Sequence, residues 1–129
     1  MFKYTVNYED FDGNQQSEVL YFNLSKPEML KLQMKNDGGY AEYLQKIANS
    51  NNPAEVLDAF SDIVLMAYGQ KSEDGKRFVK SEEAKMAFSQ SVAYDTFLFE
   101  LIENPAIIEN FMNGVFPKDL LEKAAASAQ

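Results

Sequence analysis

A series of helix-start signals divides this chain into short helices and so limits the folds open to it. The stretches at 25–28 (Ser-Lys-Pro-Glu), 52–55 (Asn-Pro-Ala-Glu), 81–83 (Ser-Glu-Glu) and 104–105 (Asn-Pro) each place Ser or Asn before Pro or Glu. Ser and Asn side chains accept hydrogen bonds from the free N–H groups of a first helical turn, and Pro is tolerated there because it has no N–H. The sequence therefore predicts several short helices.

Apolar residues follow these signals at helical spacing. The stripe that begins at Val56 continues through Phe60 and Val64, and we expect Gly69 to end this helix as a C-terminal cap. Further helices are expected after Ser25, over Tyr40 to Ala48, after Ser81, from near Val92, from Pro105 and from Lys118, where the last residues fray.

The first 24 residues are expected to form a β-hairpin. Phe2, Tyr4, Val6 and Tyr8 alternate with polar residues, and 12–14 (Asp-Gly-Asn) suits a turn. An isolated hairpin is marginal in water, so it must pack on the helices. The fold class is therefore α+β and mainly α, with the hairpin on a bundle of about five to seven short helices. We expect a single domain, 1–129, made of the hairpin (1–24), a helical core (25–116) and a short C-terminal helix with a frayed tail (117–129).

Composition argues against most catalytic chemistry. The chain of 129 residues has no Cys and no His, so thiol chemistry, the commonest general base and the commonest metal ligands are missing. We expect no catalytic residue, no cofactor and no metal. The N-terminus does not resemble a signal peptide, and the longest apolar run, Ile63 to Tyr68, is too short for a bilayer, so no membrane association is expected.

The net charge limits which classes of partner the chain can bind. It is −8, from 20 acidic and 12 basic residues. Nucleic-acid binding depends on clustered Lys and Arg, so we expect none. Three interpretations of the charge stay open: a means of solubility, an acidic surface for a basic partner, and an imitation of nucleic acid.

Two ligand-loop motifs are rejected. The stretch at 69–77 (GQKSEDGKR) has five residues between its glycines where a phosphate-binding loop has four, and Arg77 stands where that loop has a hydroxyl, so it is interpreted as a polar turn. The stretch at 10–14 begins like a calcium loop, but Tyr21 occupies the twelfth place, where Glu is needed.

Some apolar residues do not fit the expected core stripes. Phe99 lies four residues from both Asp95 and Glu103, so it shares their polar helix face. These residues either pack on the hairpin or form a partner-binding surface. The candidate partner-binding residues are Phe99, Met112, Phe116, Leu120 and Leu121.

The order of several segments resembles one family. The segments YFNLSKPEML (21–30), YGQKSEDGKRFVKS (68–81) and FMNGVFPKDL (111–120) together resemble the short tail assembly chaperones of long-tailed bacteriophages, particularly siphophages. The resemblance covers nearly the whole chain.

The resemblance implies a non-enzymatic assembly factor. Such a protein would act in the host cell cytoplasm, be absent from the mature virion, and bind the tape measure protein to keep it soluble and assist tail tube assembly. In many members a frameshifted, extended form recruits tail tube protein, although nothing in this sequence shows a frameshift; self-association is left open. If so, replacing Phe99 or Met112 by Asp should weaken tape measure binding and leave the fold intact.

Two other functions stay open. An acidic phage protein can inhibit a host DNA-binding protein by charge mimicry of nucleic acid, and such binding would collapse with salt. A carboxylate-based enzyme would need a concave pocket that contains an acid with a strongly perturbed pKa.

Overall fold

The predicted hairpin and helices are all present where the structure describes the chain, and two further strands join them. The computed structural model describes residues 1–35 and 39–116, so the helix expected from Lys118 lies outside the described residues. The elements in chain order are β1 (Phe2–Glu9), β2 (Gln15–Phe22), α1 (Lys26–Lys35), α2 (Tyr40–Ala48), α3 (Pro53–Ala67), β3 (Tyr68–Lys71), β4 (Phe78–Val79), α4 (Glu82–Ser89), α5 (Val92–Glu103) and α6 (Pro105–Val115). This α+β architecture, mainly helical, confirms the predicted fold class.

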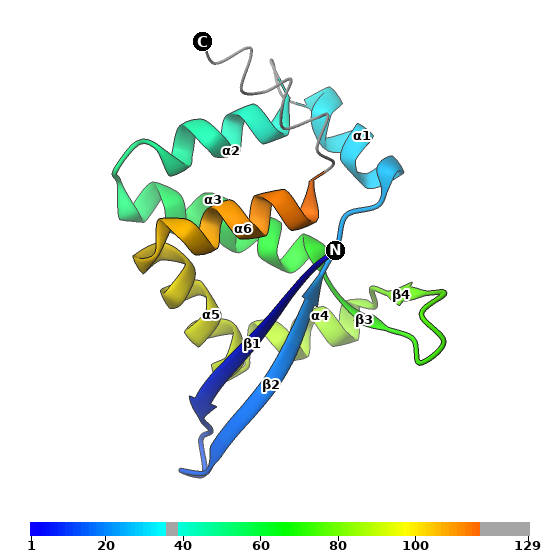
Figure 1. Ribbon diagram of the computed structural model, residues 1–129, viewed down its shortest axis with the longest axis vertical. Helices are drawn as coiled ribbons and strands as arrows, with labels where there is room; N and C mark the ends of the chain where they lie inside the picture. The colour runs from blue at the N-terminus through cyan, green and yellow to red at the C-terminus, as the bar shows by residue number, and fades with distance from the viewer. Residues whose placement is uncertain (36–38, 117–129) are drawn as a thin grey trace.

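The N-terminal hairpin has the predicted turn, and the structure supplies its register. Its strands pair antiparallel from Phe2 opposite Phe22 to Glu9 opposite Gln15. In the turn, Asp10 Oδ1 accepts hydrogen bonds from the N–H groups of Asp12 (3.0 Å) and Asn14 (2.9 Å). The turn end of the hairpin projects beyond the helices (Figure 1). Because the Asp10 carboxylate stabilises the turn itself, this stretch acts as a hairpin connection, as the rejection of a calcium loop predicts.

The predicted helix starts are capped as expected. Asn52 Oδ1 accepts hydrogen bonds from the N–H groups of Ala54 (3.1 Å) and Glu55 (3.4 Å). Asn104 Oδ1 accepts one from Ala106 N–H at 3.1 Å. The helices after Ser81 and Ser91 are capped in the same way by the serine side chains. These local hydrogen bonds are why the starts could be read from sequence.

The prediction that Gly69 ends the third helix as a cap is wrong. Helix α3 ends at Ala67, and Tyr68 leads directly into β3, which pairs with β2 through Phe22–Tyr68 and Tyr21–Gly69. β4 then pairs with β3, so the four strands form one antiparallel sheet in the order β1-β2-β3-β4. The polar turn predicted for this region is present but is flanked by two short strands.

Gly69 is required because β4 lies too close to it for a side chain, and not because its backbone is left-handed. A Cβ built on it would lie 2.6 Å from Phe78 Cε2 and 2.9 Å from the Val79 carbonyl oxygen. Such distances are shorter than van der Waals contact, and one of the two obstacles is backbone. Any larger residue at this position therefore has to push β3 and β4 apart.

An aromatic cluster joins the sheet to the helices. Phe22 is fully buried, and its ring stacks on Phe97 of α5 with centroids 4.9 Å apart. Phe111 of α6 meets the same ring edge-on at 5.6 Å. At the surface of this contact, the Tyr4 hydroxyl donates a hydrogen bond to the Glu100 carboxylate, and burial followed by that carboxylate raises the pKa of Tyr4 to about 12. The hairpin thus packs on α5 and α6.

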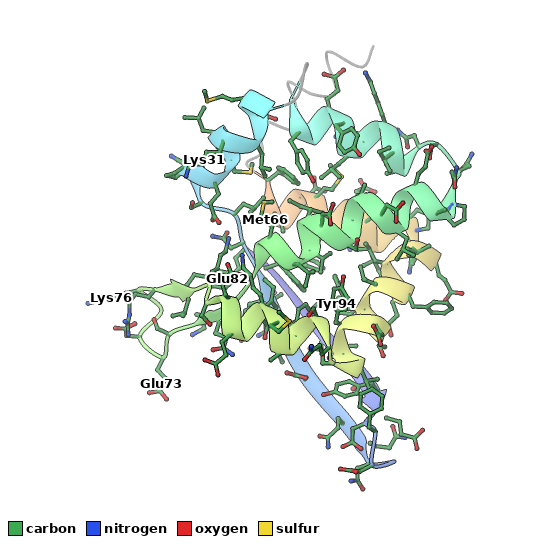
Figure 2. All side chains as sticks on the ribbon, turned by 180° about the vertical axis from the view of Figure 1, so that it is seen from behind. Lys31, Met66, Glu73, Lys76, Glu82 and Tyr94 are labelled. Carbon is green, nitrogen blue, oxygen red and sulfur yellow. The ribbon has the colours of Figure 1, made fainter. Side chains whose placement is uncertain are left out.

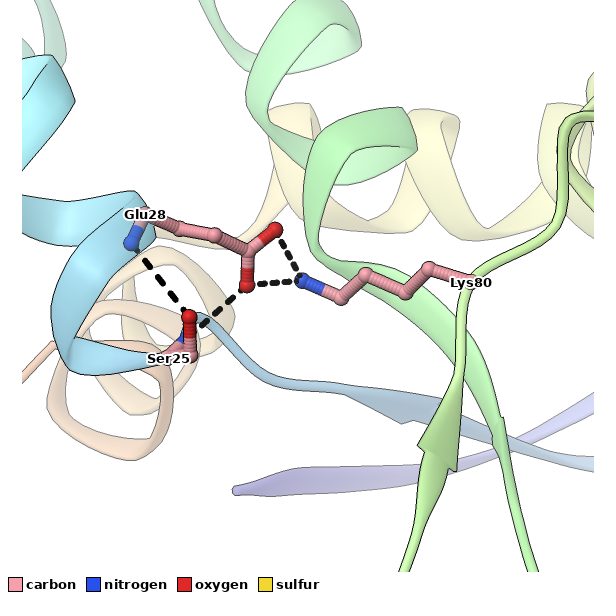
Figure 3. Close-up of polar contacts among 3 residues, drawn as sticks. All are labelled: Ser25, Glu28 and Lys80. Carbon is pink, nitrogen blue, oxygen red and sulfur yellow. Dashed lines mark hydrogen bonds and ion pairs between the residues drawn. The ribbon is translucent and has the colours of Figure 1, made fainter.

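The capping box of α1 also contacts Lys80, the residue that follows β4 (Figure 3). Ser25 N–H donates to Glu28 Oε1 at 2.9 Å, and Glu28 N–H donates to Ser25 Oγ at 3.3 Å. Lys80 Nζ donates to both Glu28 oxygens, at 2.7 and 2.9 Å. Burial alone would raise the pKa of Glu28, but the hydrogen bonds from Lys80 and Ser25 outweigh it and hold the pKa below its ordinary value. Burial lowers the pKa of Lys80, and Glu28 offsets only part of this.

Gly69→Ala should destabilise the protein. We expect the free energy of unfolding to fall by about 1–3 kcal/mol, because the added methyl group overpacks the β3–β4 contact. Urea denaturation measures the change. Gly75→Ala is the comparison: Gly75 has φ 73° and no atom near its Cβ position, so only backbone strain of about 1 kcal/mol is expected. A Gly69→Ala protein as stable as the wild type would contradict the close contact.

Glu28→Gln should lower stability at neutral but not at acid pH. The folded pKa of Glu28 lies below its unfolded value, so its charge stabilises the fold above the unfolded pKa, and this contribution is lost as pH falls through the folded pKa. For this partly exposed pair we expect a difference of about 1 kcal/mol near neutrality. Urea denaturation across pH gives the profile, with the exposed Glu73→Gln as control. A difference that persists once wild-type Glu28 is protonated would count against this ion pair.

Candidate partner-binding surface

The structure separates the sequence-predicted binding residues into different environments. Phe99 on α5 is 62% exposed. Met112 and Phe116 are only 5% and 3% exposed and belong to the hydrophobic core. Leu120 and Leu121 lie outside the described residues. Phe99 is therefore the predicted residue whose side chain is directly available to a partner.

The burial of Met112 follows from its place on α6. Ile108, Phe111, Met112 and Val115 recur at three- and four-residue spacing and are all buried. α6 packs on β1 so closely that a Cβ on Gly114 would lie 2.9 Å from Phe2 Cβ. The sequence already indicated that Met112 is buried, because it lies four residues after Ile108 and so shares the apolar face of the helix. Met112→Asp is therefore expected to destabilise the fold, contrary to the expectation from sequence that the fold stays intact.

A pocket that the sequence did not predict lies at the end of the helical layer. It has a volume of about 560 Å³ and lies where the connection between α2 and α3 meets the start of α6. Figure 1 shows these connections on the side of the molecule opposite the β3–β4 turn. The apolar lining comes from four helices and consists mainly of Ala48, Val56, Ile102, Ile108 and Met112. Met112 thus contributes to a possible binding site from inside the core.

The two Asn-Pro helix starts come together at this pocket. Asn52, Pro53 and Pro105 are among the residues that line it. Because Asn52 and Asn104 already accept hydrogen bonds from their own first turns, these helix ends are capped from within the chain. The pocket therefore offers an apolar surface with a polar border, to which Asn49, Glu109 and Asn113 contribute.

Three of the four helices around the pocket carry charge of one sign. Every charged residue on α3, α5 and α6 is acidic, and these residues are Glu55, Asp58, Asp62, Asp95, Glu100, Glu103 and Glu109. All except Glu100 are exposed. Glu109 lines the pocket, so the pocket border carries negative charge, which favours a cationic partner.

The turn at 72–77 has no free cradle for phosphate. Gly75 N–H donates to the Ser72 carbonyl at 3.0 Å, and Lys76 N–H donates to Asp74 Oδ1 at 3.0 Å. Arg77 N–H donates to Ser72 Oγ at 3.0 Å. Glu73 and Lys76 project away from the body of the protein (Figure 2). These backbone donors are used within the turn, which supports its interpretation as a polar connection.

Other classes of site find little support in the described part of the chain. Over 1–35 and 39–116, no group of three or more Asp or Glu residues is placed to hold a metal ion. Within the same residues, none of the helices has both the length and the hydropathy that a membrane span requires. Among the described residues that line the pocket, Glu109 alone is ionisable, so the pocket presents no pair of carboxylates for acid–base work. Its geometry suits binding.

Comparison with known proteins identifies a family. A family model described as phage tail assembly chaperone matches residues 1–129, the whole chain. No curated protein and no solved structure matches the chain. The match confirms the family resemblance that the sequence segments predict.

Asp substitutions should separate the buried candidate from the exposed one. Met112→Asp places a carboxylate in the core and should lower the free energy of unfolding by about 3 kcal/mol or more. Phe99→Asp should change it by less than about 0.5 kcal/mol, because the side chain is largely exposed. Urea denaturation of both variants checks this. Equal stability of the two would contradict the placement of Met112 in the core.

Proposed function

The chain belongs to the phage tail assembly chaperone family, and on this premise we propose that it binds the tape measure protein, keeps it soluble and assists tail tube assembly. The observation that carries the proposal is the family match over every residue of the chain. Membership implies a partner among phage tail proteins and action in the host cell during assembly. The proposal extends this to a siphophage-type chaperone that works by binding alone, in the cytoplasm, and is absent from the mature virion.

The surface is physically suited to this role. As the family resemblance implies, a tape measure protein is a long, largely helical chain whose apolar stretches would aggregate before a tube encloses them. Phe99 and the pocket provide apolar contact area for such stretches. Each bound copy would also add its net charge of −8 to the complex, which opposes aggregation.

Co-expression with the tape measure protein from the same genome tests the proposal. We expect a soluble complex with several copies of this chain per tape measure protein, measured by size-exclusion chromatography with light scattering. The complex should persist at about 1 M salt, because apolar contacts are not screened. A tape measure protein that stays insoluble, with no complex, would overturn the proposal. The absence of a complex would instead favour the acidic inhibitor, whereas a complex that dissociates with salt would show that charge, and not apolar contact, holds it together.

Phe99→Asp should reduce the amount of tape measure protein recovered in that complex. The matched control is Leu30→Asp on α1, because Leu30 is also 62% exposed and the net charge changes equally. Recovery is compared at equal expression, after urea denaturation has shown both variants to be folded. Equal losses in the two variants would indicate an effect of charge rather than of the Phe99 surface.

A further inference from the structure

We propose that the pocket at the α2–α3 connection and the start of α6 binds the apolar stripe of a positively charged amphipathic helix. The inference rests on the proposed function, and it identifies the occupant as a Lys- and Arg-bearing helical segment of the tape measure protein. It specifies the chemistry of the recognised segment, which family membership alone does not.

The apolar lining supplies the anchor site. Ile108 and Met112 are buried members of the hydrophobic core, and Val56 is 6% exposed, so these side chains are held in place before a partner binds. A volume of about 560 Å³ falls within the usual range of binding pockets. Neighbouring apolar side chains of a helix, three or four residues apart, can enter a site of this kind together. The pocket therefore suits an apolar stripe.

Helices and their connections line this pocket, which favours a helical occupant. The described lining residues come from α2, α3, α5, α6 and the connections between them, and no strand of the sheet contributes. A segment that binds as a β-strand gains affinity mainly by pairing its backbone with the edge of a sheet, and a polyproline II segment docks in an aromatic-lined groove. The described lining of this pocket offers neither a strand edge nor an aromatic side chain. A helix satisfies its own backbone and needs only side-chain contacts, so it matches what this site offers.

The negative charge at the pocket favours positively charged residues beside the apolar stripe of the bound helix. Glu109 lines the pocket, and the neighbouring helices α3 and α5 add only acidic residues. Lys46 on α2 is paired with Glu42 at 3.2 Å, so the nearby positive charge is already compensated. Lys or Arg beside the apolar stripe would be attracted to this border, whereas Asp or Glu would be repelled.

A peptide array and two variants test the inference. The tape measure protein from the same genome is made as overlapping peptides of about 30 residues, long enough to span several helical turns. Affinity for the full-length chain is measured by fluorescence anisotropy, and helicity of the bound peptide by circular dichroism. We expect the tightest peptides to be amphipathic, net positive and helical when bound.

The variants alter the pocket without touching the core. Asn113 is exposed and lines the pocket, so Asn113→Trp should fill it and weaken peptide binding at least about tenfold. Glu109→Lys should weaken binding roughly three- to tenfold at low salt and less at high salt. The controls are Ala87→Trp on α4 and Glu73→Lys in the β3–β4 turn, both exposed and away from the pocket; each should bind as the wild type does.

The outcomes distinguish this inference from the proposed function. If the wild-type chain forms the soluble complex but Asn113→Trp and Glu109→Lys bind peptides as tightly as their controls, the pocket assignment is wrong and the chaperone function stands. Tightest binding by neutral or acidic peptides, or by none while the full-length complex forms, would also overturn the inference. Failure of the complex itself would instead overturn the proposed function.

Discussion

The burial of Phe22 is the interaction on which the rest of the structure depends. A two-stranded hairpin is marginal in water unless one face is covered. Phe22, the last residue of β2, is fully buried against rings of α5 and α6. Each aromatic contact adds about 0.5–1.5 kcal/mol beyond the area that it buries. The partner rings come from both hairpins and three helices: Phe2, Tyr68, Phe88, Phe97 and Phe111. One side chain thus holds together segments from the whole length of the described chain.

The pocket lies between the same helices that pack on the sheet. Helices α5 and α6 pack on β1, while parts of α2, α3, α5 and α6 farther from the sheet enclose a space that no side chain of the described residues fills. Because Ile108 and Met112 contribute to both the core and the pocket lining, the rigidity of the core extends to the site. A preorganised site loses less conformational entropy when a partner binds, which favours affinity from a small contact area.

Sequence reasoning succeeded where the signal is local. The hairpin and the helix starts depend on neighbouring residues, such as Asp10 in the turn or Asn52 at its cap, so their pattern was sufficient. β3 was missed because Gly69 resembles a helix cap, whereas it is in fact a strand residue that pairs with Tyr21, far away in the chain. The pocket depends on how two distant connections pack, and no local pattern encodes that. The acidic helix neighbours of Phe99 indicated a polar face but left open whether Phe99 packs on the hairpin, and the structure shows it exposed.

Helix α3 passes directly into β3, and this junction has a mechanical consequence. Its 15 residues span roughly 22 Å, from Pro53 in the pocket to the sheet. No loop separates helix from strand, and Asn23 N–H donates to the Ala67 carbonyl at 2.8 Å across the junction. A tilt of α3 at its pocket end would therefore strain the pairing between β2 and β3. The helix forms a direct covalent connection between the pocket and the sheet.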